Sequence, residues 1–209
     1  MSGIRPEMPG NAPAHPLPPA QIAAEVTAMN CAFLDLLTDP LTPAGGSVLG
    51  LDPLLIQGLR ALTPEARDEL AAVPLLLADF SFPDSRQTIR YTYRVADEDP
   101  APAWVTKVDA FANRVLTALW HFSRADFGLA GFCMGFDTQT TQRLGGLSFA
   151  ELSRQAPAVC ASLRARHADH PSCWPDLIRL AAAGHTEQLN AARLGVIPLT
   201  VAMQQSTGT

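Results

Sequence analysis

Residues 49–63 read LGLDPLLIQGLRALT, and residues 134–148 read MGFDTQTTQRLGGLS. With an offset of 85 residues, glycine, aspartate, glutamine and leucine positions of the first stretch coincide with those of the second. This agreement indicates that the chain contains one helical unit twice. The aligned pairs are Gly50 with Gly135, Asp52 with Asp137, Gln57 with Gln142, Leu59 with Leu144, Leu62 with Leu147, and Thr63 with Ser148.

Both stretches carry the signals that begin α-helices. Asp52 and Thr63 are each followed by proline, and a side-chain oxygen before a first-turn proline is typical of a helix start. In the second stretch Asp137 stands where Asp52 does, and residues 148–151, SFAE, form a capping box. We therefore predict a capped pair of short helices in each half.

A longer apolar helix precedes each capped pair. Apolar residues recur at three- and four-residue steps over 20–37 and again over 105–127, which predicts two amphipathic helices. The first should end at Asp39-Pro40, because the residue before proline leaves the α conformation. The second should end at the glycines of 128–131. The two apolar stripes are Ile22, Val26, Met29, Phe33, Leu36 and Leu37, and Val108, Phe111, Val115, Leu119 and Phe122.

A second copy of such a unit explains how each half covers its apolar face. One helical unit of this size cannot bury that face alone, and a neighbouring copy removes it from water. We predict a mostly α fold of two similar helical units (helix, capped helix pair, C-terminal helix) packed as an intramolecular pseudo-dimer, with a short strand near 80–95. The alternative is that Gly-x-Asp followed by Leu-x-x-Leu recurs by chance in a leucine-rich helical chain.

Composition marks the boundaries of the two units. The first residues are rich in proline and show no period, and the acidic stretch DEDPAPA has the character of an interdomain linker. The expected order is a disordered proline-rich tail (1–19), unit 1 (20–96), the linker (97–103), unit 2 (104–203) and a tail (204–209).

Composition also excludes several classes of protein. Of the 209 residues 47% are hydrophobic and 17% charged, so the chain is neither wholly disordered nor a coiled-coil rod. The net charge of −5, made of −7 up to residue 104 and +2 after it, argues against a stand-alone nucleic-acid binder. No apolar run approaches the roughly 18 residues of a membrane helix, and no secretory signal is visible. We expect a soluble, cytoplasmic protein.

Short motifs spread over residues 22–203 carry a resemblance to a known family. In the second half they are Phe132-Cys133-Met134-Gly135, Leu144, Leu147-Ser148, Ala156 and the C-terminal stretch 181–203; in the first half they are Leu49-Gly50, Leu59, Leu62-Thr63 and Phe80-Ser81-Phe82. These motifs resemble the FlhD family, the small α-helical subunit of the bacterial flagellar master regulator. That family is a single copy that dimerises, whereas this chain carries two copies, with Ser81 and Ala78 where the family has arginine and cysteine.

The resemblance implies a role in transcription regulation through protein binding. FlhD-like subunits act with a second, zinc-carrying DNA-binding subunit (FlhC-like), and DNA would be contacted only as part of that complex. The resemblance implies no cofactor of the chain's own, and further self-association is an open alternative.

The outline of a helix-turn-helix is present at residues 137–154. An exposed QTTQ sequence at a helix start would suit contacts to bases, and two arginines could reach phosphate. The alternative is a solvated helix face that packs elsewhere through Leu144 and Leu147. The candidate nucleic-acid contacts are Gln139, Thr140, Gln142, Arg143 and Arg154.

Two further candidate sites fall between residues 160 and 173. Cysteine and histidine side chains there are zinc-ligand types, but their spacing departs from that of structural zinc sites, so unpaired side chains are the alternative. The cationic stretch could bind phosphate or an acidic partner, including the acidic half of another copy. The candidates are Cys160, His167, His170 and Cys173 as metal ligands, and Arg164 and Arg166 as a partner or phosphate patch.

No catalytic signature accompanies these motifs, since the chain has neither a G-x-S-x-G elbow nor a glycine-rich phosphate loop. We therefore predict that the protein is not an enzyme but an FlhD-like regulatory subunit that acts through protein–protein contacts. A non-DNA adaptor or scaffold is the alternative. A zinc-dependent enzyme is a third, and it would need an open coordination position on the metal.

Overall fold

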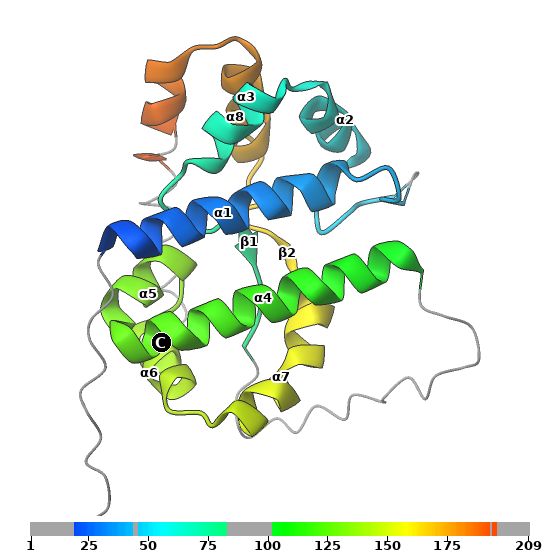
Figure 1. The fold of residues 1–209 in the computed structure, drawn as a ribbon. Coiled ribbons are helices and arrows are strands. Elements are labelled where there is room, and N and C mark those ends of the chain that lie inside the picture. Colours follow the sequence, from blue (N-terminus) through cyan, green and yellow to red (C-terminus); the bar gives the residue numbers. More distant parts are fainter. Residues whose placement is uncertain (1–18, 44–45, 83–101, 193, 196–209) are drawn as a thin grey trace, which may run out of the picture.

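The computed structural model describes residues 19–43, 46–82, 102–192 and 194–195, and nearly all of the regular structure there is helical (Figure 1). The predicted mostly α fold is confirmed. The elements are α1 (Pro19–Thr38), α2 (Pro53–Ala61), α3 (Pro64–Ala71), β1 (Ala78–Asp79), α4 (Ala103–Ala125), α5 (Phe127–Met134), α6 (Thr138–Gly145), α7 (Phe149–Ser162), β2 (Arg164–Ala165) and α8 (Cys173–Ala182); residues 186–192 are also helical.

Several predicted segments lie outside the described residues. They are 1–18 of the proline-rich tail, 83–95 of the expected strand region with 96 at the end of unit 1, 97–101 of the linker, 193 and 196–203 of unit 2, and the tail 204–209. Helices α1 and α4 begin where the predicted tail and linker end. The strand β1 precedes the region in which a strand was expected, and residues 80–82 are not part of a strand.

The predicted helix starts are confirmed by the hydrogen bonds of their capping side chains. The carboxylate of Asp52 accepts hydrogen bonds from two backbone N–H groups of α2, and the hydroxyl of Thr63 accepts one from α3. Asp137 accepts a hydrogen bond from the Thr140 N–H at 2.8 Å at the start of α6. At the start of α7, Ser148 and the residue three positions later exchange hydrogen bonds in a capping box. Each cap satisfies N–H groups that a helix start otherwise leaves without partners.

The glycines of 128–131 do not end helical structure, so this prediction is wrong. Helix α4 ends before Asp126, whose backbone is extended and whose carboxylate accepts a hydrogen bond from the Leu129 N–H at 2.9 Å. That cap starts α5, which runs through both glycines. Gly135 ends α5 with a φ of 73°, in the left-handed region that favours glycine. A side-chain cap therefore separates the two helices.

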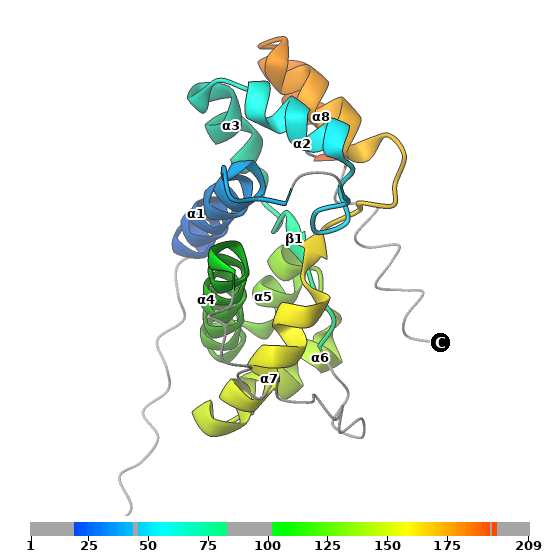
Figure 2. The same cartoon turned by 90° about the vertical axis from the view of Figure 1, so that its right-hand side faces the viewer.

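Two long helices, α1 and α4, lie beside each other at the centre of the molecule (Figure 1 and Figure 2). Helices α2 and α3 pack on α1, whereas α5, α6 and α7 pack on α4. Strands β1 and β2 pair antiparallel, with Ala78 opposite Ala165 and Asp79 opposite Arg164. Helix α8 follows β2 in the chain but packs on α2 and α3.

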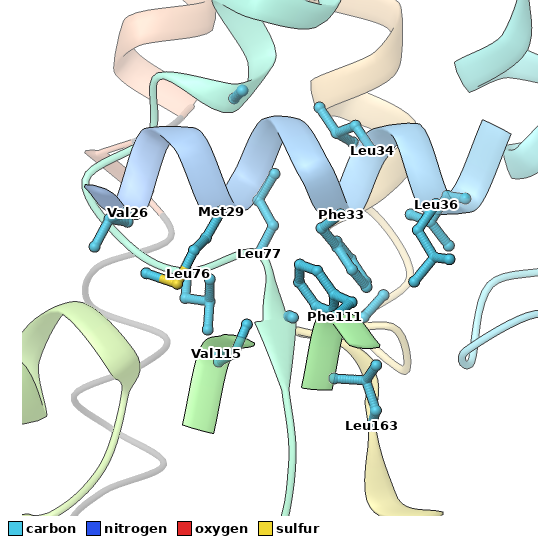
Figure 3. Packing of buried hydrophobic residues seen from close by; sticks show 14 of the residues in the cluster. Val26, Met29, Phe33, Leu34, Leu36, Leu76, Leu77, Phe111, Val115 and Leu163 are labelled. Atoms are coloured by element: carbon cyan, nitrogen blue, oxygen red, sulfur yellow. The ribbon is translucent and has the colours of Figure 1, made fainter. Parts of the chain in front are cut away.

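One apolar core runs through both halves, and every residue of the two predicted apolar stripes is buried in it. Between the long helices, Met29 and Phe33 of α1 lie close to Phe111 and Val115 of α4 (Figure 3). The ring centroids of Phe33 and Phe111 are 5.4 Å apart. By length and composition α1 is the one described helix that could cross a membrane. Inside the protein, 44% of its most apolar 18-residue stretch is buried.

A buried asparagine ties α1 to the connection between α3 and β1. The side-chain nitrogen of Asn30 donates hydrogen bonds to the carbonyls of Ala71, Val73 and Leu75 at 3.0, 3.3 and 3.0 Å. Its side-chain oxygen accepts a hydrogen bond from the Leu77 N–H at 2.8 Å. Because Asn30 has no exposed surface, these bonds replace water for a non-helical segment that crosses the core.

Candidate interaction surface on helices α4 to α7

Several of the predicted nucleic-acid contacts interact with other residues of the protein itself. Gln139 and Gln142 are exposed on α6. Thr140, however, donates its hydroxyl hydrogen to the Asp137 carboxylate at 2.6 Å, and so belongs to the helix cap. Arg143 is half-buried, with its guanidinium carbon 5.3 Å from the centre of the Phe82 ring.

Arg154 is the remaining candidate, and it is exposed on α7. Its Nε donates a hydrogen bond to the Ala150 carbonyl at 3.3 Å, one turn earlier in the same helix. Two glutamines and one arginine are therefore the predicted contacts that face solvent, which is a small set for binding to nucleic acid, where several phosphates are usually neutralised.

An aromatic pair, half-buried Trp120 and exposed Phe149, lies between the end of α4 and the start of α7. Phe149 is 63% exposed, and its ring meets that of Trp120 edge-on with centroids 6.3 Å apart. The Trp120 Nε1 donates a hydrogen bond to the Leu147 carbonyl at 2.9 Å, which fixes the orientation of the indole. The guanidinium carbon of Arg124 lies 5.1 Å from the centre of that indole. We call Trp120, Arg124 and Phe149 the aromatic shelf.

A groove of about 580 Å³ runs between α4 and α7. Its lining includes Trp104, Val108 and Asp109 of α4, and Pro157 and Cys160 of α7. Burial, together with the nearby Asp109, raises the pKa of the Cys160 thiol to about 12, so the thiol is neutral at physiological pH. The Trp104 Nε1 is buried and has no hydrogen-bond partner in the part of the chain that the structure describes. The groove is mainly apolar, with one unsatisfied donor in its wall.

The sequence did not indicate the aromatic shelf or the groove. Trp120 and Phe149 are separated by 29 positions, and each is an ordinary residue of an amphipathic helix when read alone. The only available signal was an aromatic residue placed directly after the Ser148 cap, where a polar side chain would be less costly to expose. The packing of α7 on α4 brings these residues together.

The predicted metal ligands do not form a metal site. Cys160 lies in the groove, with its sulfur 3.9 Å from the Asp109 carbonyl, and Cys173 begins α8. Burial lowers the pKa of His167 and raises that of Cys173 to about 11. Among the described residues, no group of three or more His, Cys, Asp or Glu side chains could hold a metal ion. His170 is not brought into such a group either.

Arg166 is a buried structural residue, which contradicts its predicted place in a phosphate patch. Its guanidinium donates hydrogen bonds to the carbonyls of Leu76, Ala78 and Met134. Gly135 lies directly against this guanidinium, so a side chain there would collide with it. Arg166 therefore ties β1 to the end of α5.

Arg164, the other member of the predicted patch, is exposed and pairs with Asp79 at 3.2 Å across the two strands. The pair is an exposed salt bridge, and such pairs contribute little to stability. With Arg166 buried, the patch does not exist as a surface feature.

Comparison with protein-family models, with curated proteins and with solved structures finds no match to this chain. The resemblance to the FlhD family therefore rests on the short motifs in the sequence.

Proposed function

We propose that the chain is an FlhD-like transcriptional regulatory subunit, acting in the cytoplasm through protein–protein contacts with a DNA-binding, FlhC-like partner. In this proposal its two halves form an intramolecular pseudo-dimer. The pairing of β1 with β2 is the observation that supports it best. Each strand follows the capped helix pair of its own half, and 164–165 lies 86 residues after 78–79, one residue more than the offset of 85 between the capped pairs.

The register of this pairing is compatible with a two-fold axis between the halves. Ala78 and Arg164 are equivalent under the offset, as are Asp79 and Ala165. In the structure Ala78 faces Ala165 and Asp79 faces Arg164, so each position contacts the equivalent of its neighbour. An isologous interface between two copies has such reciprocal contacts, and any antiparallel pair of two-residue strands has them too.

The segments that follow the two strands also support the pseudo-dimer. After β2, helix α8 packs on α2 and α3 in the first half. After β1, the ring of Phe80 lies 5.2 Å from that of Phe136, and Phe82 lies under the Arg143 guanidinium, both in the second half. Each half thus sends its chain across to the other.

The surface supports regulation through a partner better than direct binding to DNA. The net charge is −5, and Thr140 and Arg143 are engaged within the protein. An adaptor with no role in transcription is the second candidate, because the apolar groove and the aromatic shelf would serve any protein partner. DNA would be contacted only within a complex.

Chromatin immunoprecipitation of the tagged protein in its native host tests the proposal. We expect enrichment at discrete promoters, together with no shift of those promoter fragments by the purified chain alone at physiological salt. Partner binding without promoter enrichment would favour the adaptor. The proposal would be contradicted if no promoter were enriched and no DNA-binding protein copurified with the tagged chain.

A further inference from the structure

The groove and the aromatic shelf lie along a single seam between α4 and α7. The Cys160 sulfur lies 3.9 Å from the Asp109 carbonyl, and eleven positions away along each helix Phe149 meets Trp120. The two helices are therefore antiparallel, and the groove lies toward the Asp109 end while the aromatic shelf is at the other. Eleven helical residues span about 16 Å, so the seam matches an elongated ligand.

The end of the seam at the aromatic shelf favours a negative charge. Arg124 lies over the indole there, and Arg154 is exposed on the same helix as Phe149. The nearest acidic side chain of α7, Glu151, is engaged in the capping box, where its carboxylate accepts hydrogen bonds from the N–H and hydroxyl of Ser148 at 2.8 and 2.7 Å. The Glu151 carboxylate stays ionised and offsets the charge of Arg154, so Arg124 supplies the net positive charge of these three groups.

The groove end of the seam favours a peptide. The Trp104 Nε1 is a buried donor without a partner among the described residues, and Pro157 within α7 has no N–H of its own. Both residues line the groove. A peptide carbonyl between apolar side chains offers the acceptor that the Trp104 N–H lacks, and an unsatisfied buried polar group is costly.

We infer that this seam is a docking site for an amphipathic segment of a protein partner. The segment's apolar side chains would lie in the groove and against Phe149, and a carboxylate at one end would pair with Arg124. The inference rests on the proposed function and names the surface and the partner chemistry that this function would use. A nucleic acid is disfavoured because the walls are apolar and the exposed cations are few.

The indole N–H signals of the three tryptophans provide the assay on the full chain. The Trp104 indole N–H has no acceptor within the described ranges, whereas those of Trp120 and Trp174 donate to carbonyls. Trp174 is buried and belongs to α8, so it is an internal reference. The probe is a synthetic amphipathic peptide with leucines on one face and glutamates at one end. We expect it to shift the NMR signals of Trp104 and Trp120 and to leave that of Trp174 unchanged.

Three variants locate the site. Ser153→Arg should abolish the shifts by filling the groove, while the matched change Ala182→Arg on α8, also at an exposed position, should not. Arg124→Glu should weaken binding about tenfold. Trp104→Phe removes the unpaired N–H together with part of the ring, so it should weaken binding, read from the Trp120 signal, about fivefold. Thermal unfolding of the free variant reports the packing that is lost with the ring.

Several results would overturn the inference. They are no shift with the acidic peptide, equal shifts with a lysine-substituted or scrambled peptide, shifts with a single-stranded oligonucleotide instead, or full binding by Ser153→Arg. Promoter occupancy in cells separates this inference from the proposed function. Occupancy that survives Ser153→Arg counts against the seam alone, whereas peptide binding without promoter occupancy of the unmodified chain counts against the regulatory role alone.

Discussion

The side-chain amide of Asn30 is the most informative single group to remove. It makes four hydrogen bonds to the segment between α3 and β1, and no part of the residue is exposed. In Asn30→Ala, the buried Leu77 N–H loses its acceptor, and three carbonyls lose a donor. No water can reach them without opening the core.

The expected loss of stability follows from those four bonds. A buried N–H left unsatisfied costs about 1–3 kcal/mol, and each lost bond contributes about 0.5–1.5 kcal/mol. Since two amide hydrogens serve three carbonyls, we expect a total near 4 kcal/mol. For a protein of this size that corresponds to a fall in Tm of about 8–16 °C.

Urea unfolding followed by circular dichroism measures the change, and the chain supplies its own control. Asn113 aligns with Asn30 in the repeat with an offset of 83 residues. It is exposed on α4, and its side-chain nitrogen donates a hydrogen bond to the Asp109 carbonyl of its own helix at 2.8 Å. Asn113→Ala should change the free energy of unfolding by less than about 0.5 kcal/mol. If Asn30→Ala lies within about 1 kcal/mol of this control, the structural role assigned to Asn30 is refuted.

Three further predictions concern the turn at the end of α5, the thiols and the linker. Gly135→Ala should lower the Tm far more than Gly184→Ala, because both have positive φ but only the former meets a guanidinium; equal shifts in thermal unfolding would disprove this. The thiols of Cys160 and Cys173 should be alkylated more slowly than free cysteine near about pH 8, as measured by mass spectrometry, because burial raises their pKa values to about 12 and 11. For the same reason the free energy of unfolding should fall as the pH rises past the ordinary thiol pKa, since the unfolded chain then loses its thiol protons first. Cleavage at a protease site inserted within 97–101 should leave two fragments that elute together in gel filtration, and separate elution would contradict the shared core.

Much of the local structure was predictable because its signals lie within one turn of helix. Asp52, Thr63 and Asp137 each cap a helix whose first residues they touch, and a cap needs only the next three residues to act. The failure at 128–131 has the same local origin. Asp126 caps α5, but the glycines that follow it indicate a helix end when the sequence is read alone. A glycine inside a helix lowers the stability by only about 1 kcal/mol relative to alanine, which packing can offset.

The candidate site was not predictable to the same degree. The sequence marked Arg143 and Arg166 as surface cations, yet one stacks on Phe82 and the other is buried among carbonyls. Charge and spacing describe what a side chain can do, whereas its neighbours decide whether it is free to do it. The aromatic shelf was missed for the same reason, since Trp120 and Phe149 become neighbours only when α7 packs on α4.

The amino-acid sequence by itself determined where the helices of this protein begin and which of their faces are apolar. These properties depend on residues three or four positions apart, and hydrogen bonds within one turn enforce them. Only the tertiary structure decided that Asn30 is a buried tie while Asn113 is solvated, and that β1 pairs with β2. Partners separated by 40 or more positions meet only through the packing of whole helices, and the same short motif then acquires different neighbours in each half.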